Sequence, residues 1–176
     1  MNVNIKDSLL PEDTFSRIAN TIMSGEFPWF YTPSVTMQEK ATLMDYQFFH
    51  PVYIQDQIVS NYFQLLGPLF EAINAFSIFG CKLNCNPYSG DTIHEHGMHQ
   101  DVRDLPKGLR INTAVFYLNT NNGYTLVKST NEKIESVANR LVTFDSEEYH
   151  TGSTTTDKKA RYVVNINYIP AKEKGV

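Results

Sequence analysis

The sequence predicts a mainly β domain in which N-terminal helices cover one face of a jelly roll or sandwich. Two observations lead to this fold class: apolar residues recur at helical spacing in the front of the chain, and apolar and polar residues alternate from Ser77 onward. The 176 residues suffice for one core, and no repeat or change of composition divides them. We therefore expect a single domain over residues 1–176, with a helical support region at 1–76 and a jelly-roll core at 77–170.

The front of the chain predicts two helices and two strands. Apolar residues recur at helical spacing from Phe15 to Met23, between the start signal Pro11 and the stop signal Gly25. A second helical pattern covers residues 59–73, although an internal Gly-Pro pair must kink or divide it. Two aromatic-rich runs between these helices are typical of strands: residues 30–36 and 46–53.

The C-terminal part of the chain, from Ser77 onward, is predicted to form a series of short strands. Its β-branched or aromatic runs are separated by clusters of Gly, Asn, Asp, Ser and Thr. The expected strands cover residues 77–88, 110–120, 123–130, 133–137, 140–146 and 161–169. If the helices bury the outer face of one sheet, the inside of the roll remains free to hold a site.

Composition argues against several classes of partner. The 19 acidic residues outnumber the 15 basic ones, and the basic residues are scattered, which argues against an electrostatic nucleic-acid interface. Only Cys81 and Cys85 are present, which favours buried thiols in a reducing compartment. The chain has no signal-peptide pattern and no apolar run approaching about 18 residues. We expect a soluble, cytoplasmic protein without membrane contact.

The segment "HEHGMHQD", residues 94–101, contains three of the five histidines and an aspartate. Imidazole and carboxylate ligands together suit divalent iron, manganese, zinc or copper. Two i, i+2 pairs compete: His94 with His96, as in cupin metal sites, or His99 with Asp101. Gly97 between the pairs lets the chain change direction, so alternation alone does not choose.

A distal histidine supplies a further partner. We expect residues 154–157 to form a hairpin loop that pairs Ser153 with Lys158. His150 then lies opposite Arg161 on the same face, with Cβ atoms roughly 5 Å apart. A histidine and a guanidinium side by side inside a roll need an anion near them, because an unpaired buried charge is costly.

The order of these residues resembles the iron(II)- and 2-oxoglutarate-dependent dioxygenases. In that family an HxD...H facial triad, here "HQD" at 99–101 and then His150, is followed shortly by an arginine or lysine, here Arg161. The runs "VFYLNTNNGYT" and "NRLVTFDSEEYHTGS" are similar to the prolyl-hydroxylase-like branch found in phage and bacterial proteins. The resemblance covers residues 77–168. It implies a double-stranded β-helix, a form of jelly roll, with helices packed on the outside of one sheet.

By this resemblance, His99, Asp101 and His150 are the catalytic iron ligands, and Arg161 forks two N–H bonds onto the far carboxylate of 2-oxoglutarate. Charge supports the assignment. The two positive charges of iron and the one of Arg161 balance the two negative charges of 2-oxoglutarate and the one of Asp101. A neutral assembly is easier to place in a low-dielectric interior than bare iron.

Further cosubstrate contacts are expected from three residues. Many relatives carry Ser or Thr two places after the arginine, and this chain has Val163 there. Cosubstrate binding is therefore expected to involve Tyr88, Thr113 and Asn165. Tyr88 shares strand parity with polar neighbours, although a turn that exposes it is an equal alternative.

The resemblance implies hydroxylation of an unknown substrate with Fe(II), 2-oxoglutarate and O2, with release of succinate and CO2, and ascorbate as a reductant. The substrate is a prolyl or other peptidyl residue or a free small molecule. Specificity is expected in the loops at 25–43 and 104–109. No arginine follows Arg161, which argues against nucleic-acid base repair. A phage-encoded protein of this kind would act in the host cytoplasm.

Two other hypotheses stay open at this point. One is a cupin-type metalloprotein that uses His94, His96 and His150 without 2-oxoglutarate. The other is a non-catalytic jelly-roll module that binds a sugar or forms part of a particle. In the oxygenase hypothesis His94 and His96 lie near the entry or in a plain loop. His50 is then expected to be a core residue.

Overall fold

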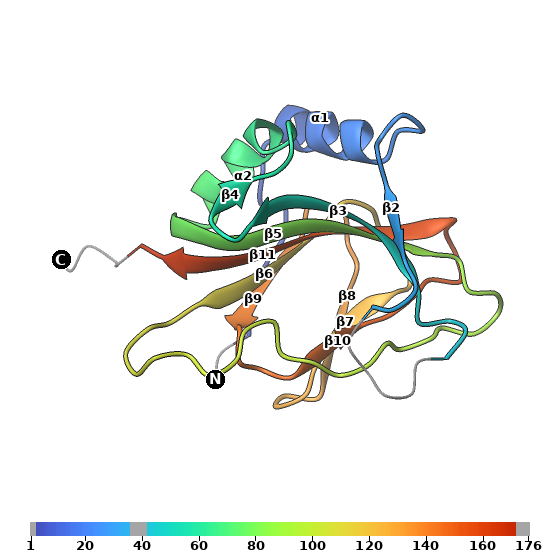
Figure 1. The fold of residues 1–176 in the computed structure, drawn as a ribbon. Helices are drawn as coiled ribbons and strands as arrows, with labels where there is room; N and C mark the ends of the chain where they lie inside the picture. The colour runs from blue at the N-terminus through green and yellow to red at the C-terminus, as the bar shows by residue number, and fades with distance from the viewer. Residues whose placement is uncertain (1–2, 36–41, 172–176) are drawn as a thin grey trace.

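The computed structural model describes residues 3–35 and 42–171, which form two facing β-sheets with helices above the larger one (Figure 1). The larger sheet has eight strands in the order β1-β9-β6-β11-β5-β3-β2, with β4 paired to β3, and the smaller has the order β10-β7-β8. The larger sheet consists of β1 (Asn4–Lys6), β2 (Phe30–Thr32), β3 (Gln47–Ile54), β4 (Gln57–Ile58), β5 (Ala75–Pro87), β6 (Asn112–Tyr117), β9 (Leu141–Asp145) and β11 (Ala160–Pro170). The smaller sheet consists of β7 (Tyr124–Val127), β8 (Glu132–Glu135) and β10 (His150–Gly152).

Helix α1 (Glu12–Ile22) follows from its apolar stripe. Phe15, Ile18 and Ile22 are buried against the outer face of the larger sheet, and Phe15 meets Phe116 of β6 edge to face with ring centroids 6.0 Å apart. The expected second helix is divided at its glycine, into a 3-10 turn (Gln64–Leu66) and the short helix α2 (Gly67–Ala72). Both helices cover one face of the larger sheet (Figure 1), as predicted.

The two central strands β5 and β11 sort their side chains by face. Leu83, Val164 and Ile166 point outward and are 0% exposed in the core beneath the helices. The alternate residues point inward and are largely polar, and the register places Arg161 opposite Asn86 and Asn165 opposite Lys82. The inside of the roll is therefore a polar cavity, and the apolar core lies on the outer side of this sheet.

The smaller sheet is extended by the irregular histidine segment. Isolated antiparallel bridges join Glu95 to Ser153 and His99 to His150, so residues 94–101 lie along the free edge of β10. His96 N–H also donates to the carbonyl of Gly152 at 3.0 Å. This pairing brings the sequence cluster onto the wall of the roll that faces β11.

The hairpin expected between His150 and Arg161 is wrong. Strand β10 pairs with β7, whereas β11 pairs with β5 and β6. Residues 153–159 cross from one sheet to the other, because Asn122 holds the segment that was expected to turn. The hydroxyl of Thr155 and the backbone N–H of Thr156 both donate to Asn122 Oδ1. Asp157 accepts the backbone N–H of Asn122 at 3.0 Å. His150 and Arg161 therefore face each other from opposite sheets.

The other expected strands are confirmed within the described residues, while Thr36 at the end of the first expected strand lies outside them. The short strands β1 and β4 were not predicted, because runs of two or three residues leave no measurable alternation. Strand β10 was expected as one arm of the hairpin, but with the wrong partner. The described part of the chain contains no helix of the length and apolarity that crossing a bilayer requires.

We expect Ile18→Ala to lower the free energy of unfolding by about 2–5 kcal/mol, because it leaves a cavity between α1 and the larger sheet. Ile18 is 0% exposed. Urea denaturation measures the loss, and Arg17→Ala, at an exposed position of the same helix, should stay within about 0.5 kcal/mol. Equal effects of the two substitutions would contradict the packing described for α1.

Candidate metal centre

Three side chains that were singled out from the sequence meet at one point inside the roll. His99 and His150 exchange two backbone hydrogen bonds of 2.9 Å, so their imidazoles project side by side with ring centroids 4.5 Å apart. Asp101 reaches the same point, with carboxylate oxygens 3.6 Å from His99 Nε2 and 3.8 Å from His150 Nε2. One ligand atom of each residue lies within 4.8 Å of the others, which is the spacing of a group that could hold a metal ion.

Backbone carbonyls orient both imidazoles. His99 Nδ1 lies 3.1 Å from the carbonyl of Gly97, and His150 Nδ1 lies 3.0 Å from the carbonyl of Glu148. Because a carbonyl only accepts, each Nδ1 carries the proton and each Nε2 keeps its lone pair. The lone pairs of both rings are thus directed toward Asp101, as metal ligation requires.

Neighbouring polar groups hold Asp101 in place. The hydroxyl of Thr113 lies 3.0 Å from Asp101 Oδ2 and 2.8 Å from Asn167 Oδ1, and Asn165 Nδ2 lies 3.4 Å from the same carboxylate oxygen. Burial raises the pKa of Asp101, but the contact with His99 and the nearby His150 outweigh burial and the net shift is downward. Asp101 is therefore an anion at neutral pH.

The donor set fits divalent iron. Two neutral imidazoles and one carboxylate on a single side of the ion are the 2-His-1-carboxylate arrangement of non-haem iron sites. Burial also lowers the pKa of His150, so this ring is neutral and ready to ligate at pH 7. The chemistry of the donors thus agrees with the iron assignment made from the sequence.

Arg161 lies in the same cavity as the two imidazoles and is 3% exposed. Its Nε donates to Ser136 Oγ at 2.7 Å, and its Nη2 donates to Thr125 Oγ1 at 3.0 Å. The ring of Tyr117 lies 5.4 Å below the guanidinium carbon. These two hydrogen bonds use two of the five N–H groups that a guanidinium carries. No carboxylate in residues 3–35 or 42–171 forms an ion pair with it, so this buried cation requires an anionic ligand.

Two glycines make room for the guanidinium. A Cβ atom on Gly152 would lie 3.2 Å from Arg161 Nη1, and one on Gly123 would lie 2.8 Å from Arg161 Cδ and 2.6 Å from the carbonyl of Thr154. Two buried amide oxygens that line this cavity, Asn84 Oδ1 and Asn165 Oδ1, accept no hydrogen bond from the described residues. Unpaired polar atoms and an unpaired cation in one cavity indicate a ligand site.

The cavity lies between the sheets and its lining comes from both. The wall from the larger sheet contains Gln47, Lys82, Asn84, Asn86, Val115, Arg161, Val163 and Asn165. The opposite wall contains His96, His99, Thr125, His150 and Gly152. From the sequence, Asn84 and Asn86 were expected on one face of a strand that borders a wet pocket, and both line this cavity. Lys82 was missed, although the same alternation in "CKLNCN" extends back to it.

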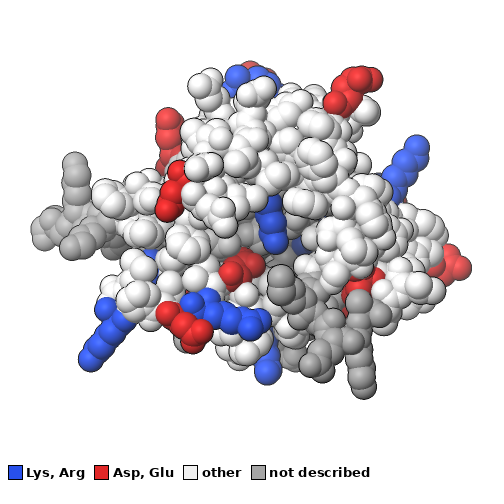
Figure 2. Space-filling model, in the orientation of Figure 1, with Lys and Arg blue, Asp and Glu red and all other residues white. Residues whose placement is uncertain are grey.

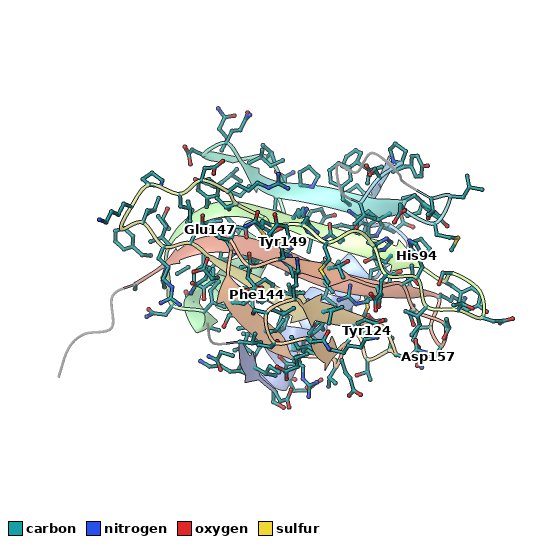
Figure 3. The ribbon with its side chains drawn as sticks, turned by 90° about the horizontal axis from the view of Figure 1, so that it is seen from below. His94, Tyr124, Phe144, Glu147, Tyr149 and Asp157 are labelled. Atoms are coloured by element: carbon teal, nitrogen blue, oxygen red, sulfur yellow. The ribbon has the colours of Figure 1, made fainter. Side chains whose placement is uncertain are left out.

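His94 and His96 form a separate cluster with Asp45. Asp45 Oδ1 lies 2.8 Å from His94 Nε2 and 3.4 Å from His96 Nδ1, and Asn86 Nδ2 lies 3.2 Å from His96 Nε2. The three residues are spaced closely enough to be a second group that could hold a metal. His150 does not belong to it, so the set His94, His96 and His150 is not brought together. Figure 3 shows His94 toward one end of the roll, with Glu147 toward the opposite end.

The remaining expected residues lie in three different places. Tyr88 is 48% exposed, with its hydroxyl 3.5 Å from Asp91, and the structure does not bring it to Arg161. Thr113 contacts Asp101, and Asn165 lines the cavity next to it. His50 points away from the cavity, with its ring nitrogens 2.8 Å from the carbonyl of Pro28 and 2.7 Å from Ser60 Oγ. Residues 36–41 of the first expected specificity loop lie outside the described residues.

Comparison with known proteins agrees with this geometry. A family model described as the 2OG-Fe(II) oxygenase superfamily matches residues 83–169. No curated protein matches the chain.

Solved structures of prolyl hydroxylases share the fold. The enzyme from Trichoplax adhaerens, in complex with a hypoxia inducible factor oxygen degradation domain peptide fragment, is 16% identical and has a TM-score of 0.62, covering 95% of this chain and 83% of that chain. A Pseudomonas putida prolyl-4-hydroxylase is 16% identical with a TM-score of 0.58, covering 96% and 92%. The viral collagen prolyl hydroxylase from Paramecium Bursaria Chlorella virus-1 is 15% identical with a TM-score of 0.57, covering 97% of both chains. The predicted double-stranded β-helix is thereby confirmed.

The protein should lose stability as the pH falls, because His96 is buried. Burial lowers the pKa of His96 to about 4 from an ordinary value of 6.5. Between these pH values the unfolded chain binds a proton at His96 that the folded chain does not. The free energy of unfolding therefore drops as the pH falls through this window, by at most about 3 kcal/mol from this residue. Urea denaturation at about pH 7 and about pH 5 should show a smaller drop for His96→Gln than for wild type, and equal drops would contradict the assignment.

Proposed function

Since the chain belongs to the 2OG-Fe(II) oxygenase superfamily, we propose that it hydroxylates an organic substrate with O2 and 2-oxoglutarate and releases succinate and CO2. The observation that supports this most strongly is the shared cavity, which contains the two imidazoles and an arginine that has no acidic partner among the described residues. The three ligand residues of the metal group carry the reaction centre in this proposal.

His99, Asp101 and His150 would hold the iron, through His99 Nε2, one Asp101 oxygen and His150 Nε2. When bound with 2-oxoglutarate, iron(II) supplies O2 activation coupled to oxidative decarboxylation of the keto acid. The protein contributes geometry: the Nδ1 bonds fix both rings, and Thr113 restrains the carboxylate. No side chain needs to act as a nucleophile.

Arg161 would bind the far carboxylate of 2-oxoglutarate. Ser136 and Thr125 fix the plane of the guanidinium, so that its remaining N–H groups are oriented before the ligand arrives. The Arg161 charge and the two charges of iron balance the three negative charges of Asp101 and the dianion. A neutral ensemble explains why these groups are tolerated inside the roll.

Water exclusion comes from the apolar residues on the same walls. Val115 and Val163 line the cavity between the polar side chains and are 5% and 4% exposed. Where they line the wall they offer water no hydrogen-bonding partner, in contrast to the polar side chains around them.

The rival hypotheses receive less support. In the cupin hypothesis His94, His96 and His150 share one ion, whereas His94 and His96 contact Asp45 and His150 contacts Asp101. A non-catalytic module gives no reason for a buried arginine that has no acidic partner in the described part of the chain. The oxygenase proposal accounts for both arrangements.

Asp101→Ala should abolish succinate release in the presence of iron, ascorbate and 2-oxoglutarate, because it removes the anionic iron ligand. Wild type should release succinate slowly even without substrate. His94→Ala is the comparison, since this side chain belongs to the Asp45 cluster. We expect His94→Ala to bind iron as wild type does. The reverse result, with iron lost in His94→Ala and kept in Asp101→Ala, would favour the cupin hypothesis.

Arg161→Gln should weaken binding of 2-oxoglutarate about a hundredfold, because a forked charge-assisted contact is replaced by a single neutral donor. Arg161→Lys keeps the charge without the fork and should fall between Gln and wild type. Titration with N-oxalylglycine, a non-reactive analogue, measures these affinities, and thermal unfolding controls for the fold. Unchanged affinity in folded Arg161→Gln would remove Arg161 from the proposed site.

A further inference from the structure

A second cavity opens on the other side of the metal group. Its volume is about 440 Å³, within the range of small-molecule sites. Its walls come from β3, the turn after it, β5 and β11, and are mostly apolar: Phe49, Pro51, Tyr53, Ile54, Phe79, Gly80 and Cys81. Asp101 and Asn167 lie at its inner end. We call this cavity the outer groove. Figure 2 shows a hollow near the centre of the face in view, with basic and acidic atoms beside each other in it.

Lys82 stands where the two cavities meet. It lines the outer groove and also the cavity of Arg161, as does its cross-strand neighbour Asn165. On its other side it pairs with Pro51 of β3. Lys82 and Asp101 both line the outer groove, yet no ion pair joins Lys82 to an acid within residues 3–35 and 42–171.

The position of Lys82 makes it a poor partner for the far carboxylate that Arg161 is proposed to bind. Arg161 pairs with Asn86 and Asn165 pairs with Lys82, so the two cations are four positions apart along the strands. At a rise of about 3.3 Å per residue their backbones lie roughly 13 Å apart. The two cations therefore mark opposite ends of the interior, on either side of the metal group.

Charge balance indicates that the group that pairs with Lys82 is negatively charged. Iron, Asp101, 2-oxoglutarate and Arg161 together are neutral, so the ammonium of Lys82 leaves one positive charge in excess. A partly buried cation beside an apolar wall is stabilised by an anion that arrives with a ligand. Asp56, the other acid of the groove, lies in the exposed turn after β3.

We propose that the outer groove binds a small monocarboxylate substrate, whose apolar, aromatic-sized body lies against Phe49, Pro51 and Phe79 while its carboxylate pairs with Lys82. This inference rests on the proposed oxygenase function and names its substrate class. A hydroxyl or N–H group next to the carboxylate would also satisfy Asn165 Oδ1, which accepts no hydrogen bond from the described residues. The reacting C–H bond then lies beside Asp101, near the carboxylate end of the substrate.

The test compares an acid with its neutral isostere. Hydrocinnamate and hydrocinnamamide have nearly the same shape and differ in charge, and calorimetric titration of each into wild type loaded with Mn(II) and N-oxalylglycine gives their affinities. We expect the acid to bind about tenfold more tightly or better, and Lys82→Met to reduce this ratio to near one. Lys158→Met, which removes an exposed lysine outside both cavities, should keep the wild-type ratio.

Several results would overturn the proposal. Equal binding of acid and amide to wild type, no binding of either, or an unchanged ratio in Lys82→Met would each do so. A parallel loss of N-oxalylglycine affinity in Lys82→Met would place Lys82 with the cosubstrate.

Repeating the titration without metal separates the substrate proposal from the proposed oxygenase function. If Mn(II) and N-oxalylglycine do not bind, the oxygenase function fails, while the ratio of acid to amide still tests Lys82.

Discussion

The two backbone hydrogen bonds between His99 and His150 are the contact on which the rest of the site depends. Both are 2.9 Å long, and together they make an antiparallel pair whose side chains project from the same face. They fasten an otherwise irregular segment to the edge of the smaller sheet, and the aspartate two places further on is thereby carried to the same point. The two histidines are far apart in the sequence, and this strand pairing makes them neighbours in space.

The cavity also depends on the different composition of the two faces of the larger sheet. The outward residues of β5 and β11 join α1 and α2 in a core in which Leu83, Val164 and Ile166 are 0% exposed. Burial of this apolar surface stabilises the fold, so the inward face can carry asparagines, a lysine and an arginine. Binding of a charged ligand would relieve the cost of those groups, which couples ligand affinity to the stability of the roll.

The sequence allowed much of this to be predicted because alternation and helical spacing report directly on buried faces. Residue order predicted the group of His99, Asp101 and His150, and the structure brings these three side chains together. The hairpin error has a specific cause: Asn122 binds the segment that was expected to turn, and residues distant in sequence gave no local sign of it. Asp45 and Lys82 were also missed, the first because its histidine partners are far along the chain, the second because a single lysine in a strand is usually solvent-facing.

The most direct test of the account is anaerobic titration of the protein with iron(II) and 2-oxoglutarate, followed by visible absorption. A keto acid that chelates iron produces a charge-transfer band that neither component gives alone. If His99, Asp101 and His150 hold the iron, the band should require both ligands and saturate at one iron per chain. Two results would contradict this assignment. One is that no band appears although iron is bound, and the other is that the band saturates while the group formed by His99, Asp101 and His150 is empty.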